Sequence, residues 1–108
     1  LGINTEFTVY SSQEWERIIN PDSGTWGLHV SLNLKANKFI NPPGGASFMP
    51  ASTYGKYGVQ LGFIQPKLDS HTINPEFQTN LSILDVLLLY GKEETLRMVK
   101  NYWIDWAN

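Results

Sequence analysis

The stretch Thr25–Lys35, TWGLHVSLNLK, carries the clearest hydropathy pattern in the chain. Apolar and polar side chains alternate along it, the first set being Leu28, Val30, Leu32 and Leu34 and the second His29, Ser31, Asn33 and Lys35. A period of two is typical of a β-strand with one face in the core and the other polar. We therefore expect a strand here, with His29 on its polar face.

Two further strands are expected on either side of this one. Tyr57–Gln65 alternates in the same way, and Gly58 and Gly62 leave bare backbone on one of its faces. Such a strip usually accepts a ring from a neighbouring strand. Glu6–Tyr10 predicts a short strand by the same period, whereas Ala36–Lys56 has no period and predicts a long loop.

Helices are expected at both ends of the chain. Ser11–Glu14 has the capping-box pattern of a helix start, which predicts a short helix that Asn20-Pro21 ends. Near the C-terminus, Asn74–Tyr90 predicts an apolar helix that Gly91 ends, and Glu93–Trp106 predicts a second helix. The predicted fold is therefore α+β, a small antiparallel sheet with a short N-terminal helix and a C-terminal helical hairpin packed on one face.

Composition limits the classes of protein that remain. The 108 residues are 42% hydrophobic and 13% aromatic with a net charge of −2, which suits a single domain over residues 1–108. The chain has no cysteine, so thiolate chemistry, disulfides and zinc–thiolate sites are excluded. The charge balance disfavours general nucleic-acid binding, and the longest apolar run, Val86–Tyr90, is too short to span a membrane, so we expect a soluble protein. Because Leu1 is not an initiator methionine, we interpret the chain as a piece of a longer precursor; its compartment does not follow from the sequence.

Histidine is the usual acid or base at neutral pH, and His29 is the better placed of the two in the chain. The run Gly27–Leu32, GLHVSL, resembles one half of the motif of the two-histidine phosphoesterases. That resemblance implies paired imidazoles over a cyclic or 2′-phosphate, with a hydroxyl such as that of Ser31 holding a phosphate oxygen. The second histidine, His71, has Thr72 directly after it rather than two residues on, so the other half of the motif is absent.

Other constellations are weaker. Asp69-Ser70-His71 is best explained as a turn, and a metal site formed by His29 and His71 with Asp69 or Glu76 lacks the spacing of known ligand sets. The sequence Pro42–Ser47 matches no phosphate-binding loop. No metal and no cofactor are therefore predicted.

Three hypotheses of function remain. The sequence favours a non-catalytic protein-binding module, such as an inhibitor, accessory subunit or assembly protein, that meets a protein partner or a second copy through the 36–56 loop and the apolar C-terminal helix. The alternatives are a small phosphodiester- or nucleotide-directed hydrolase or lyase, with His29 as acid or base and Ser31 beside it, and a carbohydrate-stacking module. The candidate binding residues are Phe48, Met49, Tyr54, Tyr57, Asn33, Lys35 and Gln60.

Overall fold

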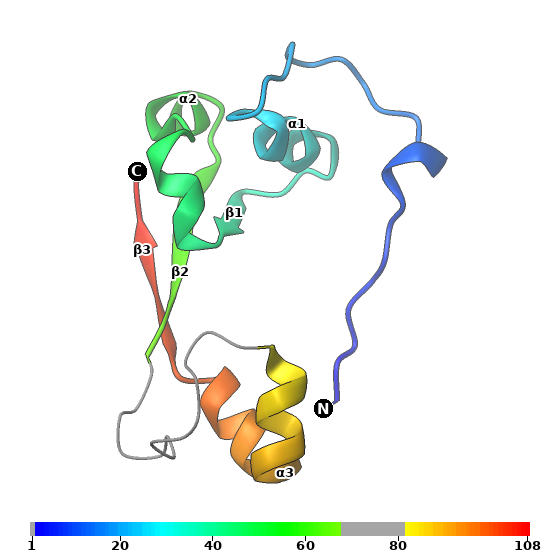
Figure 1. The fold of residues 1–108 in the computed structure, drawn as a ribbon. Helices are drawn as coiled ribbons and strands as arrows, with labels where there is room; N and C mark the ends of the chain where they lie inside the picture. The colour runs from blue at the N-terminus through cyan, green and yellow to red at the C-terminus, as the bar shows by residue number, and fades with distance from the viewer. Residues whose placement is uncertain (1, 68–81) are drawn as a thin grey trace. The chain divides into compact units, whose positions relative to one another are not determined.

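The computed structural model describes residues 2–67 and 82–108 (Figure 1). Contacts divide the chain into two compact units. We call Asn4–Gln65 with Ile104–Asn108 the core unit, and Leu1–Ile3 with Pro66–Trp103 the helical unit. The elements, in chain order, are η1 (Tyr10–Ser12), α1 (Trp26–Asn33), β1 (Lys38–Asn41), η2 (Pro43–Ser47), α2 (Ala51–Lys56), β2 (Gln60–Pro66), α3 (Ile83–Val99) and β3 (Tyr102–Trp106). The α+β class is confirmed, and the single domain over residues 1–108 stays a prediction.

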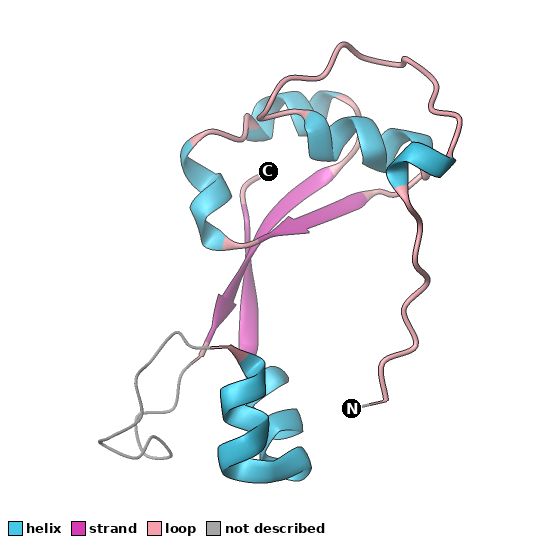
Figure 2. Ribbon diagram, turned by 45° about the vertical axis from the view of Figure 1, so that its right-hand side comes forward, coloured by secondary structure: helices cyan, strands magenta, loops and turns pink. Residues whose placement is uncertain are grey.

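The sheet has three strands in the order β1-β2-β3, drawn in magenta in Figure 2. β1 and β2 are parallel, in a register that runs from Lys38 opposite Gln60 to Asn41 opposite Phe63. Parallel neighbours need a crossover connection, and here η2 and α2 provide it. The predicted loop 36–56 thus contains a strand and a helix.

β3 is antiparallel to β2. The N–H of Lys67 donates to the carbonyl of Asn101 at 2.8 Å, and the N–H of Ala107 donates to the carbonyl of Leu61, also at 2.8 Å, so residue numbers rise along one strand as they fall along the other. The sheet is therefore mixed, and the prediction of an antiparallel sheet was wrong because β1 was not recognised.

The predicted strand over Thr25–Lys35 was also wrong, since this stretch forms helix α1. Leu28, His29 and Ser31 are its buried residues, a set that does not follow a period of two. Burial on a helix follows a period of 3.6 residues, so the alternation of apolar side chains did not report the face that packs.

Contacts from outside the helix define where α1 begins. The Asp22 carboxylate accepts the N–H groups of Gly24 at 3.0 Å and Thr25 at 2.9 Å, which turns the chain just before the helix. The buried Tyr54 hydroxyl accepts the N–H of Leu28 and donates to the carbonyl of Gly24, both at 3.1 Å. Leu28 is the third residue of α1, and its N–H is one of the first-turn donors that have no partner within the helix, so the Tyr54 hydroxyl satisfies it.

The hydrophobic core lies in the core unit. Its buried members are Leu28, Tyr54, Val59, Leu61 and Phe63. Gly62 on β2 is also buried, and a Cβ built there would lie 2.6 Å from Ile104 and 2.8 Å from the Trp106 ring. The prediction that a ring from a neighbouring strand covers a glycine of this strand is confirmed at Gly62, whereas nothing lies within 4 Å of a Cβ at Gly58.

The predicted helices at the two ends of the chain differ from those observed. Residues 6–9 form no strand and residues 15–19 no helix; the described N-terminal segment contains only the short turn η1.

In place of the predicted C-terminal hairpin there is one helix, α3, which Ser82 caps through its bond to the N–H of Leu84. α3 is interrupted at Gly91, whose φ of 76° and ψ of 178° suit glycine almost exclusively, and the expected second helix ends early because Tyr102–Trp106 is β3. The predicted helix start at Asn74 lies outside the described residues.

Candidate functional site

His29 lies inside an aromatic cluster of the core unit. Its side chain is 4% exposed, and its Nε2 is 3.3 Å from the Tyr10 hydroxyl. The imidazole centre lies 5.6 Å from the ring of Trp26 and 6.3 Å from that of Trp15, and Tyr10 stacks on Trp15 at 4.6 Å. Among the described residues, its buried Nδ1 has no hydrogen-bond partner. His29 is therefore enclosed by rings rather than displayed on a polar sheet face.

The N-terminal segment is held against α1 by a second contact. The Asn33 side chain accepts the N–H of Glu16 at 2.7 Å and donates to the carbonyl of the same residue at 3.1 Å, and it also donates to the carbonyl of His29. The side-chain amide of Asn33 thus bonds the N–H and the carbonyl of one residue, as the main chain of a neighbouring strand would. These bonds hold the segment that carries Tyr10 and Trp15 against α1. Asn33 thus has a structural function in the cluster.

The structure does not bring the predicted catalytic and polar binding residues to one face. The buried Ser31 hydroxyl donates to the carbonyl of Gly27 at 2.8 Å, so its proton is engaged within the helix. Lys35 follows the end of α1 with a φ of 55°, and Gln60 begins β2; both are exposed. The strand face on which the hydrolase hypothesis relied is absent, because α1 directs successive side chains about 100° apart.

The predicted aromatic binding residues divide into exposed and buried ones. Phe48 and Tyr57 are 57% and 48% exposed, and Met49 is partly buried against the core. Tyr54 is fully buried, and its hydroxyl serves α1. Phe48 and Tyr57 are thus available to a partner, whereas Tyr54 is part of the core.

Three leucines are the most exposed large apolar side chains of α3. Leu88 is 85% exposed, Leu84 64% and Leu89 63%. Leu84 and Leu88 are four residues apart and share one face of the helix. The prediction of an apolar helix in this region is confirmed for these residues; its proposed start, before Ser82, is outside the described residues.

A basic hollow in the helical unit was not predicted from the sequence. Its volume is about 350 Å³, and Lys67, Arg97, Lys100 and Asn101 line it. Arg97 and Lys100 are three residues apart at the end of α3, a spacing that could have indicated a shared face. Lys67 lies at least thirty residues earlier in the chain, so sequence spacing does not connect it with them.

In the described residues, 2–67 and 82–108, no group of three or more histidine or acidic side chains could hold a metal ion. His71, Asp69 and Glu76 lie outside these ranges. None of the described helices combines the length and the apolarity that a membrane span requires.

The fold and the site define a small cysteine-free α+β protein with an aromatic-enclosed histidine, an exposed leucine face and a basic hollow. In a comparison with protein families, one family model matches most of the chain. The model of the WbqC-like protein family matches residues 1–97, and the chain belongs to that family. No curated protein and no solved structure has significant similarity to it.

Proposed function

We propose that this chain is a non-catalytic protein-binding module whose contact surface is the leucine face of α3, formed by Leu84, Leu88 and Leu89. The observation that carries the proposal is the exposure of these three side chains, 63% or more in each. Leucines at positions i and i+4 are the anchors by which an amphipathic helix enters an apolar groove of a partner. Removing such side chains from water favours association by about 25 cal/mol per Å² of apolar area.

The surroundings of His29 support a non-catalytic function over the hydrolase alternative. A general base must lie within hydrogen-bond reach of the proton it takes from a substrate. The imidazole is 4% exposed, and the neighbouring Ser31 hydroxyl already donates within α1. A substrate would have to displace the rings of Tyr10 and Trp26 to reach it.

Site-specific photo-cross-linking tests the proposal. A photoreactive phenylalanine analogue replaces Leu88, and in a matched protein it replaces Leu34, which is 57% exposed in the core unit. We expect one protein species to be cross-linked from position 88 and not from position 34, and we expect Leu84→Glu to abolish that product. Mass spectrometry identifies the species, and mixed isotope labelling shows whether it is a second copy of the chain. Equal cross-linking from positions 88 and 34, or none from position 88, would refute the proposal.

The carbohydrate-stacking alternative has one observation in its favour. Tyr10 and Trp26 are 40% and 46% exposed, and their ring centres are 5.1 Å apart. Exposed aromatic rings can stack on sugar faces. Titration of a glycan panel with tryptophan fluorescence as the readout, repeated with Trp26→Ala, tests it; emission that stays constant across the panel refutes it.

A further inference from the structure

The basic hollow combines cationic side chains from two separate parts of the helical unit. Lys67 follows β2, whereas Arg97 and Lys100 lie at the end of α3. Among the described residues, no acidic side chain lines the hollow. The chain as a whole has a net charge of −2, so this concentration of positive charge is not a consequence of composition.

The main chain around the hollow is fixed by hydrogen bonds. The N–H of Lys67 donates to the carbonyl of Asn101 at 2.8 Å, and the Asn101 side-chain amide donates to the carbonyl of Lys67 at 3.0 Å. The N–H of Lys100 donates to the carbonyl of Leu96 at 3.2 Å, which completes the last turn of α3. The main chain at both lysines is therefore held in place by hydrogen bonds.

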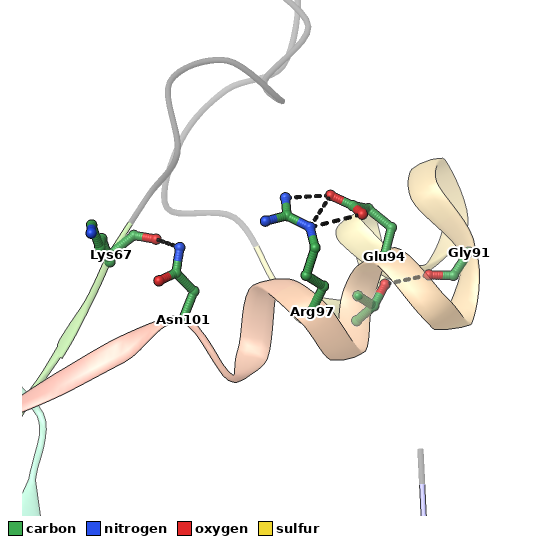
Figure 3. A network of polar contacts seen from close by, with 6 residues as sticks. Lys67, Gly91, Glu94, Arg97 and Asn101 are labelled. Atoms are coloured by element: carbon green, nitrogen blue, oxygen red, sulfur yellow. Dashed lines mark hydrogen bonds and ion pairs between the residues drawn. The ribbon is translucent and has the colours of Figure 1, made fainter.

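Arg97 is engaged by a carboxylate. Its Nε donates to both oxygens of Glu94 at 3.0 Å, and its Nη2 lies 2.6 Å from Oε1 (Figure 3). These hydrogen bonds lower the pKa of Glu94, which keeps the carboxylate charged and the pair formed. Glu94 thus offsets the charge of Arg97, and the surplus of positive charge comes from the lysines. Within the described part of the chain, no ion pair involves the ammonium group of Lys67 or Lys100.

The stability of α3 accounts for the presence of a positive charge at Lys100 but not at Lys67. A cation at the carboxyl end of a helix stabilises the exposed carbonyl groups, and Lys100 occupies the C-cap of α3. Lys67 belongs to no helix. Its position beside Lys100 is therefore the feature that structural need does not account for.

We propose that the basic hollow binds the phosphate group of a phosphorylated small molecule through Lys67 and Lys100. A phosphate monoester carries a charge of about −1.5 to −2 at neutral pH, which two ammonium groups match. Lysine binds phosphate as a point charge and needs no fixed orientation. The hollow is broadly open to solvent, and its volume of about 350 Å³ exceeds what a bare phosphate ion fills, so it has room for part of the organic portion of the ester as well. This inference does not depend on the proposed protein-binding function of α3.

The test is an NMR titration of the full ¹⁵N-labelled chain with glycerol 3-phosphate at low salt, and in parallel with glycerol and with inorganic phosphate. We expect saturable shifts of the Asn101 side-chain amide and of the Lys67 and Lys100 main-chain amides with the ester, and none with glycerol. Lys67→Gln and Lys100→Gln should each weaken binding about tenfold, because each removes one charge-assisted contact. The matched control is Lys92→Gln, which removes the same charge from an exposed position of α3 outside the hollow.

The outcomes separate specific from general attraction. If all three variants bind equally, or if the shifts do not saturate, the hollow is not a phosphate site and the proposal is overturned. If inorganic phosphate binds as tightly as the ester, the hollow recognises a bare anion and the small-molecule part of the proposal is overturned. Lys67→Arg and Lys100→Arg should retain binding, and a loss in both would also contradict the proposal, because the charge is preserved.

Discussion

Removing one atom, the Tyr54 hydroxyl oxygen, tests how much its hydrogen bonds at the start of α1 stabilise the fold. The hydroxyl accepts the N–H of Leu28, a first-turn donor that has no partner within the helix, and donates to the carbonyl of Gly24 just before the helix. Tyr54→Phe removes the oxygen and keeps the ring, which is fully buried and lies 6.0 Å from that of Phe39. The N–H and the carbonyl then lose their partner while water remains excluded.

The expected loss of stability follows from these contacts. A typical intramolecular hydrogen bond contributes about 1 kcal/mol, and a buried donor left unsatisfied costs about 1–3 kcal/mol. With two bonds lost and one buried N–H left without an acceptor, we expect the free energy of unfolding to fall by about 3 kcal/mol. For a chain of 108 residues, that corresponds to a decrease in Tm of about 13 °C.

Urea denaturation followed by tryptophan fluorescence measures the effect. The matched control is Tyr57→Phe, since Tyr57 is 48% exposed and the same atom is removed where water can replace it. We expect the control to stay within about 0.5 kcal/mol of the wild type. A Tyr54→Phe variant as stable as the control would show that α1 closes its first turn without the hydroxyl, and the reasoning would be refuted.

The same variant tests a pH dependence. Burial raises the pKa of the Tyr54 hydroxyl above its ordinary value of 10.0. The hydrogen bond from the Leu28 N–H lowers this pKa in part, and the negative charge of Asp22 raises it further. The folded state therefore favours the neutral phenol. Its stabilising contribution is complete below the unfolded pKa of about 10 and is lost as pH rises through the folded pKa. The stability difference between wild type and Tyr54→Phe should accordingly narrow above pH 10; a constant difference would contradict this.

Three further substitutions are predicted to lower the free energy of unfolding measured in urea. Gly62→Ala should cost about 1–3 kcal/mol by forcing a methyl group into the Trp106 ring, and an unchanged midpoint would show that the ring moves freely. Gly91→Ala should cost about 1–3 kcal/mol through its φ of 76°, with Gly44→Ala, which meets open space, as the near-neutral control. Asn108→Ala should cost about 2 kcal/mol, because its side chain bonds main-chain groups of both β2 and α2; a loss below 0.5 kcal/mol would contradict this.

Sequence reasoning succeeded where the determining contacts are local. β2 and the break at Gly91 were recognised because period-two alternation and a positive φ are properties of a few adjacent residues. α1 was not, since its start depends on Tyr54, which follows Leu28 by twenty-six residues. Its alternating apolar residues also satisfy a strand period by chance.

β3 was missed although a signal was present. Leu96, Val99, Trp103 and Trp106 fit a helical spacing, but Tyr102–Trp106 is also rich in aromatic and β-branched residues, which favour strands. For the candidate site, the sequence identified His29 as unusual and placed it wrongly. The ring cluster and the basic hollow each combine neighbours on one helix with a distant segment, Tyr10 and Trp15 in the cluster and Lys67 in the hollow, and no spacing rule brings those segments to the helix.

Because Gly62 on β2 has no side chain, the Trp106 ring of β3 can lie across β2 and reach a side chain of β1. The Lys38 ammonium on β1 lies 5.5 Å from the centre of the Trp106 ring on β3, and that ring rests over the bare backbone of β2 between them. The emission of an indole responds to a nearby positive charge, so Trp106 is an intrinsic fluorescent reporter of sheet assembly. In a protein whose other three tryptophans are replaced by phenylalanine, its spectrum would follow the arrival of β1 and β3 at opposite edges of β2 during refolding.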